Sequence, residues 1–303
     1  MFLKKYILKF QQYMKGLNYS PRTITEYGCQ LNFFFKYLQT KGILNLNQIT
    51  KEVILNYQMS LFSQERPLSL QTQLSRLFSM KSLFKYLMRT NQILYDPSYG
   101  LTLPKRSKRL PKTILTKKEV FRLLDKPNAD TPLGLRDKAM LEVLYSTGIR
   151  NQELRQLIIY DVNTDSHDLM IRQGKGKKDR MIPLGEIASN YVDEYIQYGR
   201  PKLMGGKKTD LLFISKNGRA ITAGNFIWIL NKYVQLAKID KKITPHVIRH
   251  TFATHLLKNN ASLRHIQELL GHASIETTQI YTQLEVSDLK RVHKKFHPRE
   301  RDV

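Results

Sequence analysis

The sequence predicts a mainly α protein in two domains, with one small β-hairpin in the second domain. Apolar residues recur at the three-and-four spacing of amphipathic helices along most of the chain. The spacing changes to alternation around residues 169–184, where two short runs flank a segment rich in glycine and lysine. At 303 residues the chain is too long for one ordinary core, and its hydrophobic content of 41% is ample for two.

The composition indicates a polyanionic partner. The chain has 50 Lys and Arg against 25 Asp and Glu, which gives a formal net charge of +25 spread over both halves. Nucleic acid is the leading candidate, and a basic surface that serves only solubility is the alternative. No apolar run approaches the ~18 residues needed to span a bilayer, and the start lacks a signal-type apolar core. We therefore expect a cytoplasmic protein without membrane contact.

Residues 1–103 are expected to form a small helical domain. Three helices are predicted there, each preceded by a residue that can cap it: Ser20, Thr50 and Ser69. The aromatic residues fall on the apolar stripes of these helices, so we expect them in the core and not as platforms for stacking bases. Cys29, the only cysteine, excludes an intrachain disulfide and a Cys-based zinc site. Its place on the first helix predicts burial.

Residues 104–112 are expected to form a basic linker between the domains. Two prolines, several basic residues and no periodicity are typical of an extended connection. The linker either lies along a phosphate backbone or is merely solvated, and the sequence leaves both readings open. Its candidate DNA-binding residues are Lys105, Arg106, Lys108 and Arg109.

Residues 113–303 are expected to form the second domain. A capping box from Thr116 to Glu119 opens it. Helices are predicted at 133–146, 151–157, 186–199 and 223–237, and strands at 169–172, 180–184 and 211–214. The first two of these strands make a hairpin with a cationic tip, whose candidate DNA-binding residues are Lys177, Lys178 and Arg180.

The stretch from Thr244 to Tyr281 carries most of the chemistry. Thr244 caps a predicted helix that presents His246 and Arg249 on one face. Two arginines can bind the non-bridging oxygens of a phosphodiester and offset the charge of its transition state. A tyrosine can then be the nucleophile, provided that a histidine accepts its proton, because an unperturbed phenol has a pKa of about 10. A lysine on a hairpin can protonate the leaving sugar oxygen.

Four sequence boxes bring these residue types together in a fixed order. They resemble those of the tyrosine recombinases, the phage-integrase family, and within that family the Xer type. The matching runs are Thr147–Leu154, Gly174–Arg180, Pro245–His255, and Leu270–His272 with Thr277–Tyr281. The resemblance implies a helical, SAM-like core DNA-binding domain and a tyrosine-recombinase catalytic domain, together forming a C-shaped clamp around DNA. It implies no cofactor.

The resemblance also implies a role for each site residue. Arg150 and Arg249 would bind the scissile phosphate, Lys175 would protonate the 5′ oxygen, and His272 would hydrogen-bond the phosphate. His246 would assist proton transfer at Tyr281, which would form a 3′-phosphotyrosyl link. Glu153 would hold an active-site side chain by an ion pair, and the alternative is an ordinary charge on the helix surface. His250 is interpreted as a buried, hydrogen-bonded support.

The implied function is site-specific DNA recombination through a Holliday junction, either chromosome-dimer resolution or integration and excision of a mobile element. The implied partners are double-stranded DNA with a specific site, further protomers that complete a homo-tetramer or a hetero-tetramer with a paralogue, and a DNA translocase. Residues 284–296 are predicted to form an amphipathic tail helix. This helix docks either on its own domain or on a neighbour's.

The sequence allows three alternatives to this function. The first is a catalytically idle DNA-binding protein of the same fold, and the second is a type IB topoisomerase with the same chemistry. The third is a metal site at His246 and His250, but no Glu lies between them in the His-Glu-x-x-His manner and no carboxylate cluster supports a metal. We therefore expect no metal. We also expect no ATP, because the chain has no Gly-x-x-x-x-Gly-Lys-Ser/Thr loop.

Overall fold

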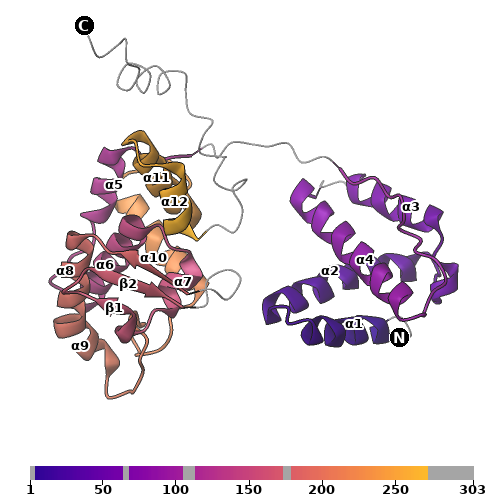
Figure 1. The fold of residues 1–303 in the computed structure, drawn as a ribbon, viewed down its shortest axis with the longest axis horizontal. Helices are drawn as coiled ribbons and strands as arrows, with labels where there is room; N and C mark the ends of the chain where they lie inside the picture. Colours follow the sequence, from indigo (N-terminus) through magenta and orange to yellow (C-terminus); the bar gives the residue numbers. More distant parts are fainter. Residues whose placement is uncertain (1–3, 64–67, 105–112, 173–178, 272–303) are drawn as a thin grey trace, which may run out of the picture. The chain divides into compact units, whose positions relative to one another are not determined.

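The computed structural model describes residues 4–63, 68–104, 113–172 and 179–271 (Figure 1). The chain divides into two compact units, Met1–Lys108 and Arg109–Val303, each with its own hydrophobic core. The prediction of a mainly helical protein with a small sheet is confirmed. Among the described residues, no helix combines the length and the apolarity that crossing a bilayer would require.

The first unit is a bundle of helices around an aromatic and aliphatic core. Its helices are α1 (Lys4–Gly16), α2 (Pro21–Thr40), α3 (Lys51–Phe62) and α4 (Leu70–Arg89), with a short 3-10 turn at Leu46–Gln48. The predicted caps form, because the side chains of Ser20, Thr50 and Ser69 each accept a hydrogen bond from a backbone N–H three residues later. α2 packs against both α1 and α4, and α4 contacts each of the other three helices.

Three details of this unit differ from expectation. No helix is predicted for residues 4–16, yet they form α1 and bury Tyr6 and Phe10 among their apolar side chains. The prediction that Cys29 is buried is wrong, because Cys29 is exposed. Phe33, one helical turn later, is also 45% exposed, so both residues lie on the outer face of α2. Phe78 on α4 is 43% exposed and lies outside the core as well.

The second unit is mostly helical, with a three-stranded antiparallel sheet in the order β1-β2-β3. Its strands are β1 (Val162–Asn163), β2 (Asp168–Ile171) and β3 (Arg180–Pro183). Its helices are α5 (Lys117–Leu124), α6 (Pro132–Thr147), α7 (Asn151–Gln156), α8 (Glu186–Glu194), α9 (Arg200–Met204), α10 (Ala223–Leu236), α11 (Pro245–Lys258) and α12 (Leu263–Leu270). A 3-10 turn at Ile159–Asp161 precedes β1, and a π-helical turn at Tyr195–Gly199 joins α8 to α9.

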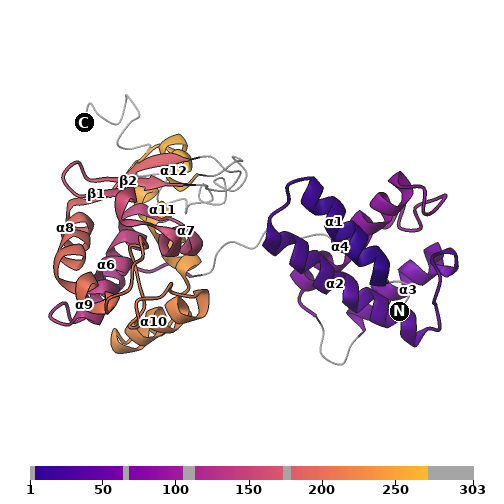
Figure 2. The same ribbon diagram turned by 90° about the horizontal axis from the view of Figure 1, so that it is seen from below.

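α6 is the central helix of the second unit (Figures 1 and 2). It contacts α5, α7, α8, α9 and α11. Ala139, Val143 and Leu144 are fully buried, as are apolar residues on its other faces, which is typical of a helix enclosed by its neighbours. The helix ends at Gly148, whose φ of +62° is in the left-handed region. This end leads directly into Arg150 and α7.

Two predictions for the second unit need correction. Residues 211–214 do not form a strand. They make two isolated bridges instead, Ile158 to Leu211 and Ile214 to Ala220, because the two ends of the segment face different partners. The helix predicted at 186–199 continues through the π-helical turn and α9 as far as Met204.

Candidate active site

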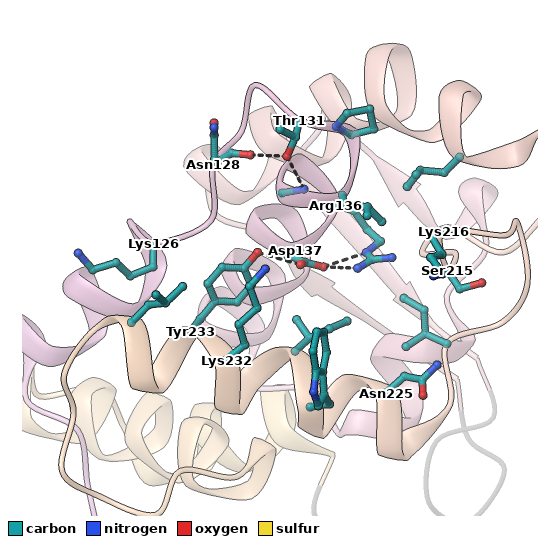
Figure 3. A pocket seen from close by; sticks show the side chains of 18 residues that line it. Lys126, Asn128, Thr131, Arg136, Asp137, Ser215, Lys216, Asn225, Lys232 and Tyr233 are labelled. Atoms are coloured by element: carbon teal, nitrogen blue, oxygen red, sulfur yellow. Dashed lines mark hydrogen bonds and ion pairs between the residues drawn. The ribbon is translucent and has the colours of Figure 1, made fainter.

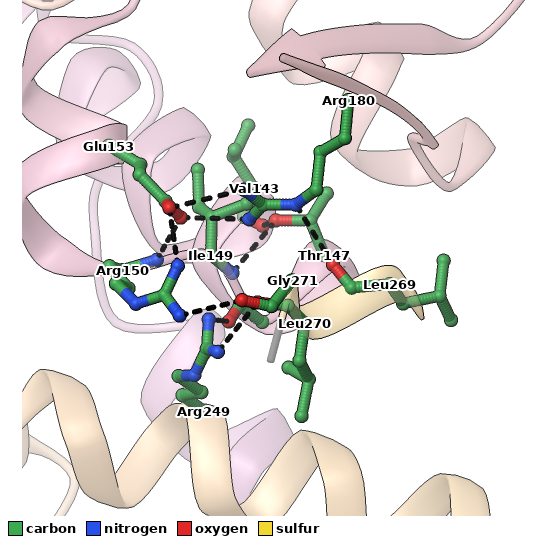
Figure 4. A network of polar contacts seen from close by, with 11 residues as sticks. Val143, Thr147, Ile149, Arg150, Glu153, Arg180, Arg249, Leu269, Leu270 and Gly271 are labelled. Carbon is green, nitrogen blue, oxygen red and sulfur yellow. Dashed lines mark hydrogen bonds and ion pairs between the residues drawn. The ribbon is translucent and has the colours of Figure 1, made fainter. Parts of the chain in front are cut away.

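Arg249 lies on α11 and is buried against backbone carbonyls. The helix starts where Thr244 caps it, as predicted. Arg249 is 5% exposed and donates hydrogen bonds to the carbonyl oxygens of Gly148, through Nη1 at 2.7 Å, and Leu270, through Nη2 at 2.7 Å (Figure 4). These two bonds fix the plane of the guanidinium between the end of α6 and the end of α12.

Arg150 lies at the start of α7 and is held by Glu153. Its Nη1 donates to Oε1 of Glu153 at 2.7 Å, and its backbone N–H donates to Oε2 at 2.8 Å. Its Nη2 donates to the carbonyl oxygen of Gly271 at 3.0 Å. Glu153 thus forms an ion pair with Arg150, one of the candidate active-site side chains.

A second arginine also binds Glu153. Arg180, the first residue of β3, donates from Nη2 to Oε2 at 2.9 Å and from Nη1 to Oε1 at 3.2 Å. Burial alone would raise the pKa of Glu153, but the hydrogen bonds from Arg180 and from the Arg150 backbone outweigh it and lower the pKa below its ordinary value. Glu153 is therefore a carboxylate that serves two guanidinium groups.

All three arginines contact backbone carbonyl oxygens at the end of α12. Arg180 approaches the carbonyl oxygen of Leu269 at 3.4 Å, Arg249 binds that of Leu270, and Arg150 binds that of Gly271. The last carbonyls of a helix have no partner within the helix and carry a partial negative charge, so they attract cations. Three guanidinium groups around one carboxylate still leave an excess of positive charge. The cluster therefore favours an anion in contact with it.

The histidines of α11 differ in exposure. His246 is exposed on the first turn of α11, whereas His250 is 9% exposed, in agreement with the expected burial. Within residues 4–63, 68–104, 113–172 and 179–271, no group of three or more His, Cys, Asp and Glu side chains could hold a metal ion.

His255 has a contact that sequence reasoning did not find. Its Nε2 lies 2.9 Å from the carbonyl oxygen of Leu115, which can only accept, so Nε2 carries the proton. Its Nδ1 lies 2.9 Å from the hydroxyl of Tyr145 on α6. The backbone N–H of the same Leu115 donates a hydrogen bond to the hydroxyl of Thr251 at 3.1 Å. Leu115 and Tyr145 are more than a hundred residues upstream, so no local pattern reveals this contact.

These buried histidines predict a pH dependence of stability. Burial lowers the pKa of His250 and of His255. At His255 the hydrogen bond to the Leu115 carbonyl opposes this lowering of the pKa, and nearby Lys117 and Lys258 add to it. The unfolded chain therefore binds protons that the folded unit does not, so stability is complete above the ordinary histidine pKa of about 6.5 and is lost as the pH falls below it. We expect the urea midpoint to be lower at about pH 5.5 than at pH 7.5. His255→Gln should reduce this difference, and an unchanged difference would contradict the assignment of His255.

Part of the predicted site lies outside the described residues. This part consists of the hairpin residues Lys175, Lys177 and Lys178, the linker residues Lys105, Arg106, Lys108 and Arg109, the residues His272 and Tyr281, and the tail helix at 284–296. Arg180 is described, and its contacts are with Glu153 and Leu269, within the same unit as the other arginines.

A separate pocket lies between α6 and α10 (Figure 3). It has a volume of about 1040 Å³, and none of its lining residues belongs to the arginine cluster. Inside it, the Asp137 carboxylate is occupied by Arg136, at 2.6 and 2.9 Å, and by the hydroxyl of Tyr233, at 2.9 Å. These polar groups satisfy one another, and the other charged residues of the lining are Lys126, Lys216 and Lys232.

Comparisons with known proteins agree on one family. The phage integrase family matches residues 113–287, and the phage integrase N-terminal SAM-like domain matches residues 7–91. The tyrosine recombinase XerD of Halalkalibacterium halodurans is 40% identical over 294 residues, which cover 96% of this chain and 96% of the relative. XerD of Listeria monocytogenes is 40% identical over 283 residues, which cover 92% of this chain and 94% of the relative.

Solved structures agree with these relatives. The crystal structure of XerA recombinase is 33% identical, covers 97% of this chain and 98% of its own, and has a TM-score of 0.55. The XerH site-specific recombinase bound to its difH substrate is 26% identical, covers 95% of this chain and 83% of its own, and has a TM-score of 0.72. The chain thus belongs to the phage integrase family and is a tyrosine recombinase of the Xer type, an enzyme of site-specific recombination.

Proposed function

We propose that this enzyme cuts and rejoins double-stranded DNA at a specific site, through a 3′-phosphotyrosyl intermediate and a Holliday junction. The observation that carries the proposal is the convergence of Arg150 and Arg249 on the end of α12. That end directly precedes His272 and the segment that contains Tyr281. A phosphate held by the two arginines would therefore lie near the start of the nucleophile's segment.

The proposed cleavage step transfers the phosphoryl group from the 5′ oxygen of the DNA to the oxygen of Tyr281. The phenolic oxygen of Tyr281 attacks the phosphorus and its proton passes to His246, while the bond between phosphorus and the 5′ oxygen breaks. Lys175 gives a proton to that oxygen, which leaves as a 5′ hydroxyl. Arg150 and Arg249 stabilise the negative charge of the transition state. Rejoining is the reverse reaction with a different 5′ hydroxyl, so no external energy source is needed.

The remaining groups would support or extend this site. His272 would hydrogen-bond the phosphate, and His250 would support α11 from its buried position. DNA binding would rest on the basic linker and hairpin, with the following contacts: Lys105, Arg106, Lys108, Arg109, Lys177 and Lys178. The net charge of +25 supports contact with phosphates along both units.

The proposed assembly has one unit on each face of the DNA, as a C-shaped clamp, with residues 1–103 and 113–303 as the two domains and 104–112 as the linker. Four protomers, of this chain alone or together with a paralogue, would hold two duplexes in the cytoplasm. The tail helix at 284–296 would dock on a neighbour, and a DNA translocase is a candidate partner. The XerH relative is bound to its difH substrate, which supports a DNA site as the substrate class.

A nicked DNA duplex tests the proposal. The recognised site is first selected from a random or genomic DNA library by binding. A nick close to the cleavage position then lets the short fragment that carries the new 5′ hydroxyl diffuse away. Without this hydroxyl the strand cannot be rejoined, so the covalent intermediate is trapped. We expect wild type to form a protein–DNA adduct that survives denaturant, and Tyr281→Phe to form none. Tyr198→Phe, which alters an exposed tyrosine of the same unit, should form the adduct normally.

Two results would contradict the proposal. An adduct that persists in Tyr281→Phe would mean that another residue is the nucleophile. Tight binding of the selected site without any adduct in wild type would support the alternative of a catalytically idle DNA-binding protein.

A further inference from the structure

Arg180 connects three parts of the second unit that lie far apart in sequence. It is the first residue of β3, its guanidinium binds Glu153 on α7, and its Nε approaches Leu269 at the end of α12 (Figure 4). Its side chain is only 14% exposed. A surface arginine that served only to attract DNA would have no need of such contacts.

The binding of Arg180 fixes both oxygens of Glu153. Oε1 accepts from Nη1 of Arg150 and Nη1 of Arg180, and Oε2 accepts from the Arg150 backbone N–H and Nη2 of Arg180. A carboxylate has about four acceptor sites, so the Glu153 carboxylate is fully used. The two parallel bonds from Arg180 set its plane. Because Arg150 is aimed by the same carboxylate, Arg180 indirectly sets the direction of the Arg150 guanidinium.

The close approach of Arg180 also explains a glycine. A Cβ on Gly271 would lie 2.9 Å from Cζ of Arg180 and 3.0 Å from its Nε and Nη1. Gly271 therefore serves two purposes, since its φ of +62° ends α12 and its missing side chain leaves room for the guanidinium. The end of α12 and the start of β3 are thereby in contact.

We propose that Arg180 is a positioning residue of the recombination reaction. It holds Glu153 so that Arg150 presents its guanidinium to the scissile phosphate, and it keeps the end of α12 against the sheet. This inference rests on the proposed function, because it requires that Arg150 contacts the phosphate. It gives Arg180 a different task from the direct DNA contact that the sequence suggests.

The first test compares cleavage with binding. Arg180→Ala should slow formation of the covalent complex on saturating nicked DNA by about 10- to 100-fold, as expected when a catalytic group is misplaced by up to about 1 Å. DNA affinity and its dependence on salt should change little. Arg172→Ala is the matched control, because Arg172 follows β2 and pairs with a buried carboxylate, that of Asp161. The control should cleave at the wild-type rate.

A double-mutant cycle tests the route through Glu153. If Arg180 acts by holding this carboxylate, the effects of Arg180→Ala and Glu153→Gln on the cleavage rate should be strongly non-additive. Additive effects would overturn the proposal. Arg180→Lys, which keeps the charge but loses the two-pronged geometry, should show an intermediate rate. It also replaces the alanine variant if that variant fails to fold.

A sulfur-substituted substrate separates Arg150 from Lys175. Replacing the bridging 5′ oxygen by sulfur gives a leaving group that needs no proton, so this DNA restores cleavage when only the acid is misplaced. We expect no restoration in Arg180→Ala, because the phosphate-binding arginine is affected. Full restoration would show that Arg180 acts on Lys175 and would overturn the inference.

The outcome for Arg150 distinguishes the inference from the proposed function. If Arg150→Ala cleaves normally, the assigned phosphate contact fails, and the proposed function must be revised. If Arg150→Ala is inactive and Arg180→Ala cleaves normally, only the positioning role of Arg180 fails.

Discussion

Arg249→Ala is expected to slow formation of the covalent DNA complex by about 10² or more. The physical reason is the loss of a charged donor that offsets transition-state charge within a largely buried site. The variant should also lose stability, because the carbonyl oxygens of Gly148 and Leu270 would lose their buried donor. Single-turnover cleavage of saturating nicked DNA measures the first effect, and chemical denaturation measures the second.

Arg200→Ala is the control that separates these two effects. Arg200 is 7% exposed and, like Arg249, donates to backbone carbonyl oxygens, here those of Thr209 and Leu211. Its removal should lower stability to a similar extent, by about 1–3 kcal/mol for carbonyls left unpaired, without slowing cleavage by the folded protein. The clamp assignment would be wrong if Arg249→Ala cleaved as fast as Arg200→Ala once both were corrected for the folded fraction.

Gly148→Ala is expected to destabilise the second unit by about 2–5 kcal/mol. A left-handed residue with a side chain costs about 1–2 kcal/mol, and overpacking adds about 1–3 kcal/mol. Gly148 has a φ of +62°, and its added Cβ would lie 2.3 Å from Cδ1 of Phe252 and 3.0 Å from Cδ2 of Leu270. The free energy of unfolding, from urea denaturation at neutral pH, measures the effect.

Gly205→Ala isolates the backbone contribution. Gly205 has a φ of +53° and also ends a helix, but a Cβ there would meet no atom within 4 Å. The cost should therefore be only about 1–2 kcal/mol. Phe252→Leu should recover part of the loss in Gly148→Ala by removing the ring. Equal costs at the two glycines would mean that the core around Gly148 adjusts freely.

Local patterns in the sequence predicted much of the fold. Ser20, Thr50, Ser69, Thr116 and Thr244 all cap helices where expected, because a cap joins a side chain to a backbone N–H only three residues away. The antiparallel pairing of β2 and β3, which were predicted at 169–172 and 180–184, followed from the alternation of apolar residues.

Which face of an element is covered could not be predicted equally well. Cys29 and Phe33 lie on a helix whose other faces are buried, and only the packing of α1 and α4 against α2 decides which side remains exposed. Residues 211–214 are as apolar as a strand, but a strand requires one continuous partner, and their two ends bridge to different segments.

In the candidate site, too, local sequence patterns determined some features and tertiary packing decided the others. The sequence by itself determined the residue types and their order along the chain. It also placed Glu153 three residues after Arg150, close enough for the two side chains to pair, and the structure shows this ion pair. Only the tertiary structure decided that Arg180 shares this carboxylate, that three arginines meet the last carbonyls of α12, and that His255 binds Leu115. Hydrogen bonds between residues distant in sequence depend on the packing of whole helices, and no local spacing encodes that packing.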